Sequence, residues 1–173
     1  GLTLLIAIPL GFYCAIRAGS FFDKAVGVLV FLGFSVPTYA LALGLMIVFG
    51  MHLGWLPVSG LSSLAWGGEF TRTQLLWDQA LHLILPVLVL SLTSLAGLSR
   101  YARSSMLEVI HQDYIRAAIA KGLTPGRVYG VHAVRNALIP IITLLGLMLP
   151  EIIGGGVIIE TLFAYPGMGR LGY

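Results

Sequence analysis

The sequence predicts an all-α membrane protein, a polytopic bundle of transmembrane helices forming one domain over residues 1–173, and two observations support this. Hydrophobic residues make up 58% of the chain and charged residues only 10%, whereas soluble domains carry roughly 25% charged residues. The apolar residues also gather into long runs that short polar intervals separate. A water-soluble fold of this size could not bury so much apolar surface, so we expect lipid to be the solvent.

Four apolar stretches are expected to cross the membrane, wholly or in part. The first is shorter than the about 20 residues that a helix needs to cross a bilayer, and we therefore expect a fragment that lacks at least one helix at each end. The second contains Pro37, which predicts a kinked or broken helix. The third is rich in small residues, which let helices approach closely in lipid. The stretches are residues 2–16, 25–53, 80–98 and 137–159.

The longest polar interval, residues 104–136, predicts an amphipathic helix, a bend and a second short helix. Gly122 is expected to end the first helix, because glycine adopts the left-handed conformation that a helix end requires. Thr124 and Pro125 are expected to begin the second helix as its N-cap and first-turn proline. The apolar residues of the first helix recur at spacings of three and four, as on one helix face. They are Leu107, Ile110, Tyr114 and Ala118.

Basic residues predict the orientation of the chain in the membrane. Eight of the ten lie in the connector after the first stretch or in segment 99–136, which alternating spans place on the same side. By the positive-inside rule this side is cytoplasmic. All three tryptophans lie in the 54–79 loop, as expected for indole rings at the opposite membrane interface. The eight basic residues are Arg17, Lys24, Arg100, Arg103, Arg116, Lys121, Arg127 and Arg135.

Several segments resemble one family of membrane proteins. Arg116-Ala117-Ala118, followed after three residues by Gly122, resembles the EAA loop in the membrane subunits of bacterial ABC importers. The runs D-Y-I-R-A-A-I-A-K-G-L-T and H-A-V-R-N-A-L-I-P resemble its peptide/nickel permease branch, as do F-S-V-P-T-Y, G-W-L-P-V-S-G and E-T-L-F-A-Y-P-G-M-G-R-L. Arg116 stands where the general motif has glutamate, and H-A-V-R replaces its I-x-L-P ending; both departures are usual in this branch.

This resemblance implies the type I ABC importer permease fold and a role in solute uptake across a bacterial or archaeal cytoplasmic membrane. It implies a second permease subunit, two cytoplasmic ATPase subunits and an extracytoplasmic solute-binding protein. The solute would be a peptide, or else nickel or glutathione. Segment 104–136 would be cytoplasmic, with its bend seated in a cleft of one ATPase. The residues expected at that contact are Arg116, Ala117, Ala118, Lys121, Gly122, Leu123, Thr124 and Pro125.

The sequence predicts no enzymatic activity, cofactor or metal site in this chain. It has no G-x-x-x-x-G-K-[ST] phosphate loop, so the ATPase partners would bind ATP and Mg²⁺. Asp23, Asp78 and the serines show no spacing typical of a catalytic triad, and few aromatics accompany the basic interval, which argues against nucleic-acid binding. The histidines are scattered over different elements and predict no metal site; they are His52, His82, His111 and His132.

Glu151 is a charged residue within the last apolar stretch. A carboxylate at mid-bilayer costs about 2.5–3.5 kcal/mol, so Glu151 is expected to face a translocation path or a partner. A position near the helix end and a helix–helix hydrogen bond are alternatives. Gly154, Gly155 and Gly156 predict either a hinge for alternating access or close helix packing. If Glu151 were an ion or proton site, the chain could instead be a secondary transporter or channel.

The segment 160–171 is interpreted as an external loop over the mouth of the path, where a binding protein would dock. It begins at Glu160, and Pro166-Gly167 predicts a turn. Phe163 and Tyr165 are expected to anchor it at the outer membrane interface. A purely structural cap fits the pattern equally well.

Overall fold

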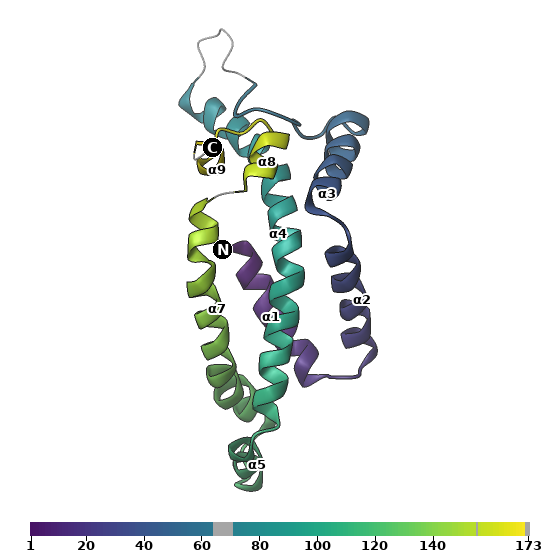
Figure 1. The fold of residues 1–173 in the computed structure, drawn as a ribbon. Coiled ribbons are helices and arrows are strands. Elements are labelled where there is room, and N and C mark those ends of the chain that lie inside the picture. The colour runs from purple at the N-terminus through teal and green to yellow at the C-terminus, as the bar shows by residue number, and fades with distance from the viewer. Residues whose placement is uncertain (64–70, 155, 172–173) are drawn as a thin grey trace. The chain divides into compact units, whose positions relative to one another are not determined.

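The computed structural model describes residues 1–63, 71–154 and 156–171, and the side chains of these apart from residues 2, 150–154, 170 and 171. All regular structure in these residues is helical, which confirms the predicted fold class (Figure 1). The elements are α1 (Leu2–Ile16), α2 (Phe21–Ser35), α3 (Thr38–Leu45), the π-helical η1 (Met46–His52), α4 (Arg72–Ile110), α5 (Asp113–Ala120), α6 (Pro125–Arg127), the π-helical η3 (Val128–Ala133), α7 (Val134–Gly154), α8 (Val157–Leu162) and α9 (Met168–Leu171).

Two helical segments within the described residues are long and apolar enough to cross a membrane, α4 and residues 125–149. The pair formed by α2 and residues 38–52 counts as a third candidate if it is one broken span, and α1 is a shorter apolar helix. The break predicted at Pro37 is confirmed, because α2 ends at Ser35 and α3 begins at Thr38. Proline disfavours helical geometry in the residue before it, while its own carbonyl accepts the N–H groups of Ala40 and Leu41 at 2.9 and 3.0 Å.

The chain divides into two compact units. Unit 1 comprises residues 1–35 and 92–148, and unit 2 comprises residues 36–91 and 149–173. Each has its own buried apolar cluster. The cluster of unit 1 consists of Phe12, Ala15, Ala102, Met106, Ile115, Val128, Ala133, Ala137 and Ile141. The cluster of unit 2 consists of Ala42, Leu85, Val89, Ile159 and Phe163.

The helices do not stop at the two ends of the polar interval. α4 does not stop near residue 98 but continues to Ile110, and no glycine or proline in 98–110 would interrupt it. Gln112 is extended, with ψ 150°, and α5 begins after it. This break shifts the phase of the apolar stripe, so Ile115 is buried and Tyr114 is exposed. Leu107, Ile110 and Ala118 do pack against the unit 1 cluster, as predicted.

The second helix of the interval is also longer than predicted. α6, η3 and α7 follow one another without a non-helical residue, and residues 125–149 form one continuous helical segment. The π-helical turn of η3 contains the exposed Gly130 and does not interrupt this segment. The outgoing side of the bend is therefore continuous with a candidate membrane span.

α1 and α4 approach each other closely at Gly11. A Cβ atom at this position would overlap the Ser99 carbonyl oxygen and lie 2.8 Å from the Ala102 Cβ and 2.9 Å from the Arg103 backbone nitrogen. Real Cβ atoms do not tolerate such distances to backbone, so only glycine fits at this crossing. Small residues commonly permit this kind of packing between membrane helices, where apolar burial alone provides little driving force.

We predict that Gly11→Ala lowers the thermal stability of the protein, because overpacking a close contact costs about 1–3 kcal/mol. The matched control is Gly27→Ala in α2, where an added Cβ would meet no atom within 4 Å. Alanine favours a helix over glycine, so the control should melt at an unchanged or higher temperature. Thermal unfolding of both variants in detergent checks this, and equal melting temperatures would contradict the assigned crossing.

Candidate functional site

The bend at residues 116–125 has the hydrogen bonds of a Schellman motif. Gly122 has φ +78°, and its N–H donates to the Ile119 carbonyl at 2.9 Å. The Leu123 N–H donates to the Ala118 carbonyl at 3.3 Å. This pair of bonds satisfies the last carbonyls of α5 and fixes the exit direction of the chain. The predicted left-handed helix end at Gly122 is confirmed.

The next helix starts as predicted, although without the side-chain bond of an N-cap. Thr124 is the N-cap residue of α6 and Pro125 occupies the first turn. The Thr124 carbonyl accepts the N–H groups of Arg127 and Val128 at 2.9 and 3.0 Å, but its hydroxyl makes no capping bond. The turn therefore depends on the backbone and on the fixed φ of proline.

The bend is exposed on its outer side and packed on its inner side. Ile115 and Val128, which flank it, belong to the buried cluster of unit 1, and Ala118 and Leu123 are half-buried against that cluster. Ile119, within the bend, is 50% exposed. The remaining outer residues predicted for the ATPase contact are all exposed: Arg116, Ala117, Lys121, Gly122, Thr124 and Pro125.

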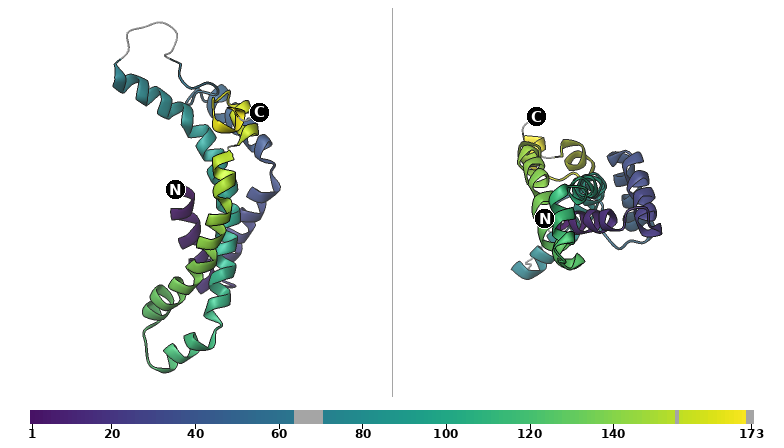
Figure 2. Two further views of the ribbon diagram at one scale, coloured as in Figure 1. Left: turned by 60° about the vertical axis from the view of Figure 1, so that its left-hand side comes forward. Right: turned by 90° about the horizontal axis from the view of Figure 1, so that it is seen from below.

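Polar contacts also hold α5 against the helix that follows the bend. Asn136 donates from Nδ2 to the Tyr114 hydroxyl at 2.9 Å and to the His132 carbonyl at 3.1 Å. Within unit 1 the chain leaves α4, reverses through α5 and α6 and returns along α7 (Figure 2). By contrast, Arg116 and Asp113 lie 3.6 Å apart with largely exposed side chains, and such pairs contribute little stability. The bend is thus a fixed projection that presents small, basic and apolar side chains.

Comparison with known protein families shows to which family the chain belongs. Residues 7–173 match the family described as binding-protein-dependent transport system inner membrane component. The chain belongs to this family. Apart from six residues at its start, the whole sequence takes part in the match, which agrees with the extent of the resemblance seen in the sequence.

Individual members of this permease family align over almost the whole chain. It is 44% identical over 170 residues to the oligopeptide transport system permease protein AppB of Bacillus subtilis, covering 98% of this chain and 52% of that protein. It is 42% identical to the di/tripeptide permease DppB of Pseudomonas aeruginosa, over 92% of this chain and 51% of that protein. The dipeptide permease DppB of Escherichia coli K12 is 37% identical, over 95% and 53%. The chain therefore spans about half the length of the curated relatives it matches.

The 160–171 segment of this family member folds around Glu160. Its Oε1 accepts the Gly169 N–H at 3.2 Å, and its carbonyl accepts the Tyr165 N–H at 2.8 Å. A Cβ at Gly167 would overlap the Glu160 carboxyl group, so glycine lets this carboxyl group lie against the backbone where the side chain closes the loop. Pro166 lies in the turn between α8 and α9. These contacts give the spacing of glutamate and glycine in the segment a local structural reason.

The prediction that Phe163 anchors this segment at the membrane interface is wrong for the described structure. Phe163 is 2% exposed and packs in the unit 2 cluster with Leu85 and Val89. Its backbone carbonyl accepts the Gly60 N–H at 2.8 Å, which joins the loop after η1 to this segment. Tyr165 packs partly buried against the same cluster. The prediction was wrong because burial of the large apolar ring in the unit 2 cluster is more favourable than its exposure at the surface.

The structure describes only some of the residues that were predicted to line or gate the path. The side chain of Glu151, the surroundings of Gly154 and all of Gly155 lie outside the described residues, so their roles stay predictions. Gly156 is described, with φ −98° and ψ 74°, and precedes α8. It lines a hollow of about 520 Å³ in unit 2 together with Tyr39 and Leu90. The predicted continuous span to residue 159 is wrong, because α7 ends at Gly154 and a new helix begins at Val157.

Folding also brings together a polar group that the sequence did not indicate. Ser63 Oγ lies 3.2 Å from His82 Nε2, and His82 Nδ1 lies 2.8 Å from the Asp78 backbone carbonyl. The Asp78 carboxylate accepts the Ser62 hydroxyl and the Ser63 N–H, at 2.5 and 2.8 Å. The Asp78 carboxylate therefore bonds to the loop, and it lies 3.7 Å from the His82 imidazole. The group fastens the loop after η1 to α4.

Sequence reasoning also missed the ion pair between Asp23 and Arg103. Arg103 donates from Nε and from its terminal nitrogen to the two Asp23 oxygens, at 2.6 and 2.8 Å. Asp23 is 6% exposed and also accepts the Gly19 N–H at 2.9 Å, while its own N–H donates to Ser20 Oγ. The S-x-x-D spacing was a capping-box signal for the start of α2. The partner 80 positions away had no sequence signal.

We predict that Asp23→Asn destabilises the protein by about 1.5–3 kcal/mol, because it leaves a two-pronged charged hydrogen bond incomplete. The control is Asp113→Asn, which removes a carboxylate from an exposed pair at 3.6 Å and should cost less than about 1 kcal/mol. Thermal unfolding in detergent separates the two variants. Equal losses would show that the Asp23–Arg103 pair contributes no more than a surface contact.

Proposed function

We propose that this chain forms the membrane-spanning path of an ATP-driven importer for solutes of the peptide class. The observation that supports it most is the exposed Schellman bend, packed on its inner side and continuous with a candidate span. The relatives are named as oligopeptide, di/tripeptide and dipeptide permeases, which favours peptides over nickel or glutathione. The chain itself would be a transport subunit, with ATP hydrolysis carried out elsewhere.

The bend is suited to pass a displacement into the membrane. The contact would be made by its exposed residues, where Ala117 and Gly122 allow close approach of a partner surface. The buried side chains beneath it, Ile115 and Val128, pack in one cluster with residues of α4 and α7. Close-packed interiors transmit strain rather than absorb it. A push on the bend would therefore move the unit 1 ends of both helices together.

The proposed assembly contains further subunits. Two cytoplasmic ATPases would bind ATP and Mg²⁺, one of them would receive the bend, and a second permease subunit would complete the path. An extracytoplasmic binding protein would deliver the solute at the 160–171 segment, where Glu160 and Gly167 hold the loop closed. Glu151 and the glycines at 154–156 would line or gate the path. Segment 104–136 would face the cytoplasm of a bacterial or archaeal cell.

Accessibility of single cysteines tests the orientation. Cys14 is 2% exposed and is replaced by alanine, and one new cysteine is then introduced at Ile119 or at Trp55. These positions are 50% and 67% exposed, on the bend and in the predicted outer loop. In right-side-out membrane vesicles, a membrane-impermeant maleimide should label Trp55→Cys, and Ile119→Cys only after the membrane is opened.

The same Ile119→Cys variant tests the ATPase contact. A bifunctional reagent added to the opened vesicles should join it to the ATPase subunit, whereas Trp55→Cys gives no such adduct. Labelling of Ile119→Cys in closed vesicles would reverse the proposed orientation. Absence of any ATPase adduct would remove the bend from the coupling contact.

A glycine pair tests whether the shape of the bend matters for uptake. Gly122 and Gly126 are both exposed and neither has an atom within 4 Å of an added Cβ, but only Gly122 has a positive φ. Valine at Gly122 should lower the equilibrium constant for forming the native bend by roughly 5–30-fold, because the left-handed conformation costs about 1–2 kcal/mol. Uptake of a labelled dipeptide should fall in Gly122→Val and persist in Gly126→Val. Equal uptake with normal ATPase assembly would refute the lever mechanism.

A further inference from the structure

A groove in unit 1 lies among α1, α2 and the second half of α4. Its volume is about 490 Å³. Asp23, Lys24, Arg100 and Arg103 line it from the first turns of α2 and the facing part of α4. The other lining residues of α2 are mainly apolar: Val26, Val30, Phe31 and Phe34, with Gly27 and Ser35. The groove therefore has a charged end and an apolar wall.

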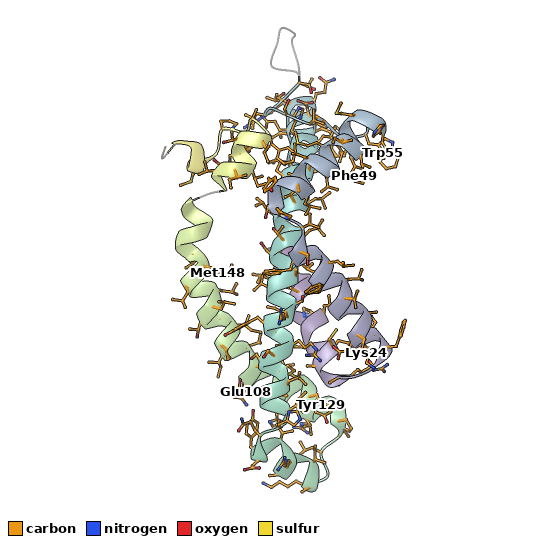
Figure 3. The ribbon with its side chains drawn as sticks, turned by 45° about the vertical axis from the view of Figure 1, so that its right-hand side comes forward. Lys24, Phe49, Trp55, Glu108, Tyr129 and Met148 are labelled. Atoms are coloured by element: carbon orange, nitrogen blue, oxygen red, sulfur yellow. The ribbon has the colours of Figure 1, made fainter. Side chains whose placement is uncertain are left out.

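The charged end has a surplus of positive charge. Arg103 is engaged by Asp23 through two hydrogen bonds, so this pair contributes no net charge. Among the residues whose side chains the structure describes, Lys24 and Arg100 have no carboxylate within 4.0 Å. Both are exposed, and Lys24 lies at the start of α2 (Figure 3). Two cations beside one neutralised pair favour an anionic occupant.

The apolar wall has the length of one membrane leaflet. From Lys24 to Phe34 the helix advances ten residues, which is about 15 Å at 1.5 Å per residue. The hydrocarbon core of a bilayer is about 30 Å thick, so a wall of this length matches half of that thickness. The Phe31 and Phe34 side chains are each 67% exposed, and aromatic surface of this kind is stable facing an acyl chain. A soluble anion would leave this wall uncovered.

We propose that this groove binds one anionic phospholipid, with its phosphate between Lys24 and Arg100 and one acyl chain along Val30, Phe31 and Phe34. Basic pockets between membrane helices on the cytoplasmic side suit such headgroups. The lipid would belong to the inner leaflet, and this assignment rests on the orientation in the proposed function. The bound lipid would fill the space between α2 and α4 around the Asp23–Arg103 pair.

Quenching by brominated lipids tests the site in the full-length protein. Phe31→Trp places a fluorophore on the apolar wall, and signal from the native tryptophans is subtracted using the parent protein. The protein is reconstituted in bilayer nanodiscs of phosphatidylcholine with increasing amounts of acyl-brominated phosphatidylglycerol, or of brominated phosphatidylcholine at the same mole fractions. We expect the fluorescence of the introduced indole to be quenched at a lower mole fraction of the anionic lipid than of the zwitterionic lipid.

Two arginines of α4 provide the matched comparison. Arg100→Gln, made in the Phe31→Trp background, should weaken the preference for the anionic lipid about fivefold, the usual effect of one basic residue at an anionic surface. Arg72→Gln removes the same charge at the other end of α4 and should leave the preference unchanged. Thermal unfolding confirms that both variants remain folded.

Each remaining result overturns the proposal. Equal quenching by the two lipids would make the groove an ordinary lipid contact. No quenching by either lipid would mean that protein covers the groove, whether another segment or another subunit. Loss of the preference on adding glycerol phosphate would point to a free anion. None of these measurements requires transport. The lipid proposal can therefore be refuted while the importer proposal stands, and the importer proposal can be refuted while lipid binding is observed.

Discussion

The structure of unit 1 depends on one packing contact, the burial of the underside of the bend against α4 and α7. Met106, Ile115 and Val128 are at most 1% exposed and come from three different elements. This part of the chain is the polar interval, where water is the expected solvent and the hydrophobic effect operates at full strength. Removing these side chains from water fixes the bend, which the exposed residues alone could not do.

The apolar part of unit 1 is held differently, because lipid offers no comparable reward for burying aliphatic groups. The crossing at Gly11 is one such close contact. The Asp23–Arg103 pair and the Ser105 hydroxyl, which donates to the Ala137 carbonyl at 2.8 Å, add hydrogen bonds where the apolar stretches meet the polar segments. Each is short-range and directional. The unit 1 cluster contains small side chains as well as large ones, with alanines at 15, 102, 133 and 137. In this part of the unit, close helix packing and hydrogen bonds stabilise the structure more than the burial of apolar surface does.

Local chemistry in the sequence predicted local structure well, whereas contacts between distant residues had no signal in a single sequence. The break at Pro37 and the left-handed Gly122 each follow from the conformational limits of one or two residues. Helix continuity was harder to predict, because the polar residues between 104 and 136 suggested helices separate from the neighbouring spans, whereas α4 continues to Ile110 and no glycine or proline in 98–110 ends it. Asp23 could be recognised as a capping residue, but its partner Arg103 could not. The type of a residue limits the contacts that its side chain can make, and the packing of other segments decides which of these contacts form.

The basic residues show how one feature serves several purposes. Together they predict the orientation of the chain, yet the structure gives individual residues different surroundings. Arg103 is held by Asp23, and the Arg17 guanidinium lies 5.2 Å from the centre of the Tyr13 ring, while Lys24 and Arg100 line the groove. An orientation signal requires only that positive charge stay on one side, so each arginine or lysine remains available for a contact of its own. The positive-inside pattern and specific anion recognition can thus coexist in the same residues, because the first depends on their sum and the second on their positions.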